Sequence, residues 1–146
     1  ALGNIGPGAA SYAPSVAELL QDDRMPVRHN AAEALGSLRA QQFAGDVQRC
    51  LEDPSCDVRA AAALALGQMG EEGAKHAETI AGLLDDPFVK VRRAACAGLG
   101  SLGQEQQQLP IAALEKLQAV KDGDGVLAVR EAAALACSHC AQHDSA

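Results

Sequence analysis

Aromatic residues are nearly absent from this sequence. It has no tryptophan, and its aromatic side chains are Tyr12, Phe43 and Phe88. The apolar fraction is nevertheless 48%, so a core must be built from leucine, valine and alanine. Alanine-rich cores are typical of closely packed helices. A chain of 146 residues suits one compact domain or one short array of repeats.

The sequence also lacks an excess of positive charge. Its formal net charge is −7, which argues against a nucleic-acid partner or an anionic membrane surface. No apolar run reaches the roughly 18 residues needed to span a bilayer, so we expect no membrane insertion. There is no charged-then-apolar leader at the start. Five scattered cysteines favour reduced thiols in an intracellular, cytoplasmic protein over a disulfide framework.

What the sequence does contain is a repeat, anchored on a Val-Arg dipeptide. The arginines are Arg28, Arg59, Arg92 and Arg130, so successive steps are 31, 33 and 38 residues. An aspartate stands six residues before each arginine, namely Asp22, Asp53, Asp86 and Asp124. Eight residues after each arginine come Gly36, Gly67, Gly100 and then Ser138. A fixed period in the low thirties is typical of an α-solenoid.

Each unit reads as two helices joined by a short turn. Upstream of the turn, apolar triplets such as Val16/Leu19/Leu20 have the i, i+3, i+4 spacing of one helical face. We call this first helix the A helix. The B helix begins near Val-Arg and carries small residues four apart, as in Ala63 and Gly67. The recurring glycine indicates close packing or a helix end, because glycine costs about 1 kcal/mol inside a helix. The sequence therefore predicts an all-α fold.

The aspartate and arginine columns predict a structural ladder beside the turns. Its members are Asp22, Arg28, Asp53, Arg59, Asp86, Arg92, Asp124 and Arg130. We expect each aspartate to accept hydrogen bonds from N–H groups at a helix N-terminus and from an arginine of the same or the next unit, since the guanidinium fork suits a carboxylate. The alternative is a basic stripe that binds a ligand.

The segment "LLDDPFVKVRRAACAGLGSLG", residues 83–103, resembles a HEAT repeat, in particular the short HEAT-like units of the phycobilin-lyase type. The resemblance extends from Gly8 to about Cys140. It implies a right-handed superhelix of stacked antiparallel helix pairs, with A helices on the convex face and B helices on the concave face. Such arrays usually serve as protein-binding scaffolds. The fourth unit departs from the pattern, because Cys137 replaces leucine and Ser138 replaces glycine.

The repeat divides the chain into one continuous domain of several units. We assign residues 7–38, 39–70 and 71–103 to the first three units, and 104–146 to an atypical fourth unit with a C-terminal tail. Residues 1–6, "ALGNIG", match the end of a B helix in register. We therefore interpret them as the tail of an incomplete repeat and expect a longer array.

Three B-helix columns vary in residue type while their neighbours repeat, which is expected where packing does not dictate the choice. The partner-binding candidates in these columns are His29, Glu33, Leu64, Gln68, Arg93, Ser101, Glu131 and Leu135. On a HEAT-like stack they would line the concave face. Leu64 and Leu135 either pack against an adjacent B helix or act as exposed anchors for a partner.

Two segments have partial metal-binding patterns. Residues 120–131 resemble a calcium loop, but the first ligand position is Val120; the alternative is an enlarged repeat turn. Cys137 and Cys140 form a zinc half-motif without a second pair, and they occupy core columns. We therefore predict no metal and no cofactor.

The predicted function is that of a non-enzymatic scaffold for protein–protein interaction. The chain has no His-Glu pair, no Gly-x-Ser-x-Gly motif and no phosphate loop. The resemblance leaves a bilin lyase-like or chaperone-like subunit as the alternative, by analogy only. A third possibility is a structural subunit of a large assembly.

Overall fold

The computed structural model describes residues 11–141, and within this range all regular secondary structure is helical. The helices, with η for 3₁₀ turns, are α1 (Ala13–Glu18), η3 (Leu19–Gln21), α2 (Met25–Ser37), η4 (Gln41–Phe43), α3 (Ala44–Arg49), η5 (Cys50–Glu52), α4 (Cys56–Gly67), α5 (Gly70–Ala74), α6 (Ala77–Gly82), η6 (Leu83–Asp85), α7 (Val89–Gln104), α8 (Ile111–Gly123) and α9 (Leu127–Ala141). The expectation for residues 1–6 lies outside the described range. Among the described helices, none is long and apolar enough to cross a membrane.

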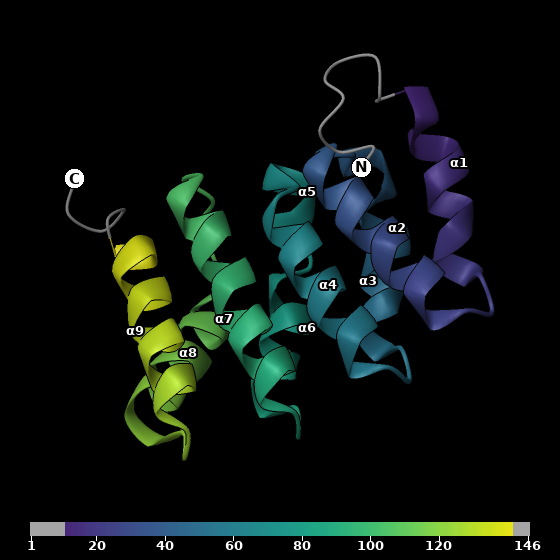
Figure 1. The fold of residues 1–146 in the computed structure, drawn as a ribbon. Coiled ribbons are helices and arrows are strands. Elements are labelled where there is room, and N and C mark those ends of the chain that lie inside the picture. The colour runs from purple at the N-terminus through teal and green to yellow at the C-terminus, as the bar shows by residue number, and fades with distance from the viewer. Residues whose placement is uncertain (1–10, 142–146) are drawn as a thin grey trace.

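The helices form two layers, which confirms the predicted all-α solenoid. The B helices α2, α4, α7 and α9 stand side by side in one row, each in contact with the next (Figure 1). The A helices α3, α6 and α8 lie behind this row in the same view. Each A helix packs on the B helix of its own unit, as α8 packs on α9.

The turn before each B helix is fixed by its aspartate. In the second unit Asp53 has an extended backbone, and its Oδ1 accepts the Ser55 N–H at 2.9 Å. Ser55 is the N-cap of α4, and its Oγ accepts the Asp57 N–H at 3.2 Å. These bonds satisfy backbone donors that a helix start leaves unpaired. The aspartate contact recurs in the other units, where the Oδ1 atoms of Asp22, Asp86 and Asp124 accept the N–H groups of Arg24, Phe88 and Val126. Each B helix therefore begins at the same distance after its aspartate.

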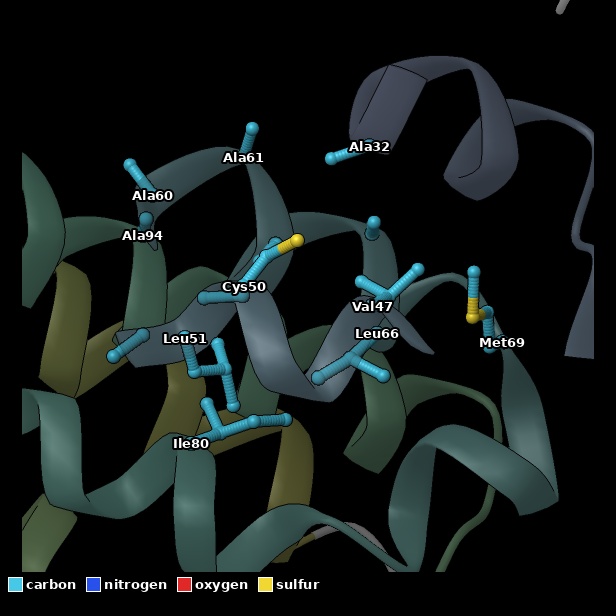
Figure 2. Packing of buried hydrophobic residues seen from close by; sticks show 14 of the residues in the cluster. Ala32, Val47, Cys50, Leu51, Ala60, Ala61, Leu66, Met69, Ile80 and Ala94 are labelled. Carbon is cyan, nitrogen blue, oxygen red and sulfur yellow. The ribbon is translucent and has the colours of Figure 1, made fainter. Parts of the chain in front are cut away.

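The core lies between the two layers and is built from small aliphatic side chains, as predicted. Figure 2 shows Val47 of α3, Leu51 of η5, Leu66 of α4 and Ile80 of α6 gathered in this space. All four are at most 2% exposed. Tyr12 and Phe88, in contrast, are about half exposed, at 55% and 52%. Phe43 is the one aromatic residue of the described range that packs against the core, and it is only partly buried.

The glycine column lies where the backbones of neighbouring B helices approach closely. A Cβ on Gly67 would lie 2.7 Å from the Gly98 Cα in the next B helix, and a Cβ on Gly36 would lie 2.8 Å from the Ala65 Cα. Both distances are shorter than a carbon–carbon contact allows. Of the two interpretations of this column, close packing is the one that the structure supports.

The longer step between Arg92 and Arg130 differs from the other steps in its helices and not in the turn before α9. Helix α7 has 16 residues and α8 has 13, whereas α4 has 12 and α3 has 6. The turn itself has its usual form, since Asp124 Oδ1 accepts the Val126 N–H at 2.9 Å. The extra residues of this step therefore lengthen α7 and α8, and the enlarged-turn interpretation is wrong.

The calcium-loop alternative has little support in the same segment. Residues 120–123 are the last turn of α8 and not an open loop. Asp122 Oδ2 accepts a hydrogen bond from Gln118, and both Asp124 oxygens accept from Arg92. Within residues 11–141, no cluster of three or more His, Cys, Asp or Glu is placed to hold a metal ion.

Candidate protein-binding surface

The exposed side of α2, α4, α7 and α9, which we call the B-helix face, carries the three variable columns. Leu64 is 45% exposed and Leu135 is 60% exposed. The residues beside Leu64 in the sequence, Ala63 and Ala65, are at most 1% exposed. Leu64 therefore points away from the interfaces between B helices and is not packed in one.

A groove of about 840 Å³ runs across this face. Its lining residues are Val16, Leu19, Val27, Asn30, Ala31, Glu33, Ala34, Ser37, Ala61, Leu64, Ala65, Gln68 and Ser101. They come from α1, η3, α2, α4 and α7. The groove thus spans the first three units and combines apolar walls with a few polar groups, which is the usual character of a ligand-binding cleft.

The structure places four of the eight candidate residues in the groove, namely Glu33, Leu64, Gln68 and Ser101. The other four, His29, Arg93, Glu131 and Leu135, do not line it. His29 Nδ1 lies 3.2 Å from the Asp57 carbonyl oxygen in the next B helix, and its Nε2 lies 3.4 Å from Glu33 Oε2. Arg93, Glu131 and Leu135 are exposed on α7 and α9. The candidates therefore extend the surface beyond the groove toward the fourth unit.

Sequence reasoning missed the contribution of the first A helix to the groove. The triplet Val16/Leu19/Leu20 has the spacing of a buried face, but Leu19 is 42% exposed. Its counterpart Cys50 is 6% exposed. The spacing alone could not separate the two, because burial depends on which unit covers the side chain. Leu19 is thus an apolar groove residue and not a core residue.

The arginine and aspartate columns form a ladder between successive units. Arg28 Nε donates to Asp53 Oδ2 at 2.8 Å, and Arg28 Nη2 donates to Asp53 Oδ1 at 3.1 Å. Arg59 repeats this contact on Asp86, and Arg92 repeats it on Asp124, with Nε–Oδ2 distances of 2.9 and 2.8 Å. Asp53, Asp86 and Asp124 thus each bind the arginine of the preceding unit, whereas the sequence had suggested the same or the next unit.

A third donor of each arginine holds the turn of its own unit. Arg59 Nη1 donates to the carbonyl oxygen of Asp53 at 2.8 Å. In the ladder pairs the arginine side chains are 13–16% exposed and the aspartate side chains 6–9% exposed. Because these forks are already occupied by carboxylates and carbonyls, the three arginines are not available to a ligand. The geometry favours the structural role.

The ladder also shifts the titration of its carboxyl groups. Burial opposes ionisation of Asp53, but hydrogen bonds from Arg28 and from the Ser55 N–H outweigh it and lower its pKa. The hydrogen bond from the Val126 N–H lowers the pKa of Asp124, and the pairing with Arg92 adds to this effect against the opposing effect of burial. Both aspartates are therefore charged in the folded chain at neutral pH.

The C-terminal cysteines pack against the core. Cys137 and Cys140 are partly buried beside core residues, and Cys140 Sγ donates to the Leu99 carbonyl oxygen at 3.9 Å. Burial raises the pKa of Cys140 to about 11 and that of Cys96 to about 12. Burial therefore keeps these two thiols protonated at neutral pH in the metal-free chain. His143 lies outside the described residues.

Comparison with known proteins agrees with this architecture. Residues 12–77 match the family model for HEAT repeats. Among solved structures, the complex of CpcE and CpcF of phycocyanin lyase from Nostoc sp. PCC7120 matches with a TM-score of 0.75 and 26% identity, over 91% of this chain and 54% of that one. No curated protein sequence matches the chain.

Designed armadillo repeat proteins share the fold as well. One, in complex with the peptide (KR)4, has a TM-score of 0.68 and 17% identity, and the match covers 91% of this chain and 65% of that one. Another, designed for modular peptide recognition, has a TM-score of 0.68 and 21% identity over 90% and 65%. The chain spans about half of the lyase chain and about two thirds of the designed ones. The predicted resemblance to HEAT repeats is therefore confirmed over residues 12–77, and the chain has the fold of the HEAT- and armadillo-like helical solenoids.

Proposed function

We propose that this chain is a non-enzymatic scaffold that binds a protein partner along the B-helix face. The observation that carries this proposal is Leu64, an apolar side chain 45% exposed in a groove of about 840 Å³. Isolated exposed leucines are common on proteins and need no explanation. Leu64 differs because it stands in a preformed groove.

The surroundings of Leu64 suit a protein segment. Glu33, Gln68 and Ser101 line the same groove and offer polar contacts around the leucine. An apolar anchor with polar groups at its margin is the usual arrangement of an interaction hot spot. Farther along the face, Leu135 is a second exposed leucine, with Arg93 and Glu131 exposed nearby in the variable columns. A partner segment could thus contact the face along several units.

The structural relatives support this use of the fold. The designed armadillo protein with the (KR)4 peptide shows that a solenoid of this fold can hold a peptide. The phycocyanin lyase structure is a complex of two different chains. Fold-level analogy supports a binding role. The proposed partner is a protein, bound either by itself or as part of a larger complex.

The test is Leu64→Glu compared with wild type. Because Leu64 is half exposed, we expect the free energy of unfolding to change by less than about 1 kcal/mol while partner binding falls. Ile111→Glu is the matched control, since Ile111 is 74% exposed at the start of α8, outside the groove. Affinity purification with the full-length protein would identify partners that Leu64→Glu loses and Ile111→Glu retains. If Leu64→Glu stays folded and retains every partner, Leu64 is not part of the site.

A second candidate function is a subunit that handles a bilin chromophore. The similarity to the phycocyanin lyase complex, at 26% identity, favours it. The groove would then hold a tetrapyrrole instead of a protein segment. Absorbance of the purified native protein separates the two proposals, because a bound tetrapyrrole is coloured. A visible band that disappears in Leu64→Glu would favour the bilin role over the scaffold role.

A further inference from the structure

The central column of the B-helix face changes in character from unit to unit. It consists of Glu33 on α2, Leu64 on α4 and Ala97 on α7. Leu64 stays 45% exposed although α4 has a described B helix on each side (Figure 1). Ala97, on α7 between α4 and α9, is exposed as well. The exposure of Leu64 and Ala97 therefore does not depend on what precedes or follows residues 11–141.

Glu33 gives the α2 side of the groove a negative charge. It is the one charged residue among the described residues that line the groove. Its side chain is 62% exposed, and Oε2 lies 3.4 Å from His29 Nε2, which carries a charge only when the imidazole is protonated. Among the described lining residues there is no lysine and no arginine. This side of the groove therefore suits a cation.

Arg93 on α7 provides the opposite charge two units farther along the face. It is exposed and forms no ion pair among residues 11–141. Lys90, on the same helix, donates to Asp57 instead, so its charge is already compensated. Arg93 lies about one helical turn before Ala97 of the central column. A group for a cation and a group for an anion thus lie on the two helices that flank Leu64.

A polar row runs parallel to the central column, about one helical turn away. It consists of Ser37, Gln68 and Ser101, one in each of the first three units, and all three line the groove. Within residues 11–141 none of these three side chains forms a hydrogen bond. Their hydroxyl and amide donors are therefore open to the main-chain carbonyl groups of a bound segment.

We propose that the groove binds a polyproline II segment of its protein partner, with a basic residue against Glu33, an apolar residue against Leu64 and an acidic residue against Arg93. This inference rests on the proposed function, since it specifies the partner of the same groove. The order of the three residues follows from the order of α2, α4 and α7 along the face. Charge complementarity at both ends fixes the segment over Leu64.

The spacing of the units favours the polyproline II conformation. Packed helices lie about 8–10 Å apart, and α4 and α7 approach closely at Gly67. Polyproline II has three residues per turn and rises about 3.1 Å per residue, so every third side chain points the same way, about 9 Å from the last. In a β-strand this repeat is two residues, about 7 Å, and does not match the units. Polyproline II also leaves its carbonyl groups free to accept hydrogen bonds from the polar row.

Peptides built on a proline host test this pattern, because proline and the residue before it favour the polyproline II conformation. The mixed-charge probe is Pro-Lys-Pro-Pro-Leu-Pro-Pro-Glu-Pro with blocked ends, and a second probe with the reversed sequence covers the opposite chain direction. The matched controls have lysine at both charged positions or glutamate at both. NMR titration of the isotope-labelled full chain measures dissociation constants up to about 5 mM and reports whether the Leu64 methyl signals move.

The better of the two mixed-charge probes should bind about fivefold more tightly than either control, because each control replaces one exposed ion pair with a like-charge contact. Glu33→Lys should change the preference to the probe with two glutamates, and Arg93→Glu should change it to the probe with two lysines. A purely structural role of either residue would not change the order of the probes. Both residues are exposed, so the variants are expected to stay folded, which circular dichroism would verify.

Three results would overturn the proposal. They are the absence of any shift of the Leu64 signals up to about 5 mM of every probe, equal affinity for mixed-charge and same-charge probes, and an order of affinities that neither charge reversal changes. Affinity purification with Leu64→Glu tests the groove separately. If that variant loses partners while the peptides show no charge preference, the groove binds a protein segment of different chemistry and only this inference fails.

Discussion

Helices α4 and α9 come from the same repeat pattern, yet they are buried to very different extents. In α4 the buried residues are Val58, Ala60, Ala61, Ala62, Ala63, Ala65, Leu66 and Gly67. In α9 they are Val129, Ala133 and Ala136. Helix α4 lies between α2 and α7, whereas α9 has α7 on one side only within the described chain. In a solenoid, therefore, burial is set by the neighbouring units, and one column of residues can be core in one unit and surface in another.

The largest expected contrast between the two regions is in the ladder. Arg59→Ala leaves Asp86, whose side chain is 6% exposed, without its partner, so we expect a loss of about 3–5 kcal/mol in the free energy of unfolding. Arg130→Ala removes no ion pair within the described chain and should cost less than about 1 kcal/mol. Chemical denaturation of both variants would measure the two values. If both variants lost a similar amount of unfolding free energy, the ion pair of Arg59 would contribute no more to stability than the unpaired Arg130.

The next contrast is in the glycine column. Gly67→Ala places a Cβ against the Gly98 backbone and should destabilise the chain by about 1–3 kcal/mol, although alanine favours a helix by about 1 kcal/mol. Ser138→Ala, in the same column of α9, should change stability by no more than about 0.5 kcal/mol. Thermal unfolding followed by circular dichroism would compare them. A stabilised Gly67→Ala variant would mean that the B helices can separate without penalty.

The smallest contrast is expected in the pH dependence of stability. The folded pKa of Asp53 is lowered, so its pairing stabilises the fold above the unfolded pKa of about 3.9 and is lost as pH falls through the folded pKa. The cost of Arg28→Gln should therefore shrink as pH falls from about 5 to about 2. Arg130 forms no ion pair among residues 11–141 and makes only a minor contribution to the lowered pKa of Asp124, so the cost of Arg130→Gln should vary less with pH. Chemical denaturation at several pH values would measure the loss in unfolding free energy for each variant. If the loss for Arg28→Gln did not change with pH, ionisation of Asp53 would not be coupled to stability.

Much of the fold followed from the spacing of a few residue types. The Val-Arg period predicted the helix pairs. The aspartate six residues before each arginine of that period marked the turns before α2, α4, α7 and α9. These features are local, since a turn or a helical face is fixed by residues within one unit. The small-residue column likewise indicated where helices pack, because close approach excludes side chains.

Features that depend on two units at once were harder to predict. Arg28 binds the carboxylate of Asp53, 25 residues away, whereas in its own unit it binds only the carbonyl oxygen of Asp22. Spacing alone does not say which of two equivalent carboxylates lies nearer in space. Leu19 lines the groove although its column is buried in the second unit. The longer third step, from Arg92 to Arg130, was visible in the sequence, but the sequence did not show that α7 and α8 take up the extra residues. The variable columns pointed to the exposed face, and four of their residues lie in the groove.

The close approach of the B helices has a mechanical consequence for the groove. At Gly67 the backbones of α4 and α7 are already in contact, and packed atoms resist compression. The row of B helices therefore acts like a stop that limits how far the stack can bend toward its B-helix face. Contacts between main-chain atoms therefore set a minimum width for the groove. Because the units cannot move much closer together, ligand binding should require little rearrangement of the stack.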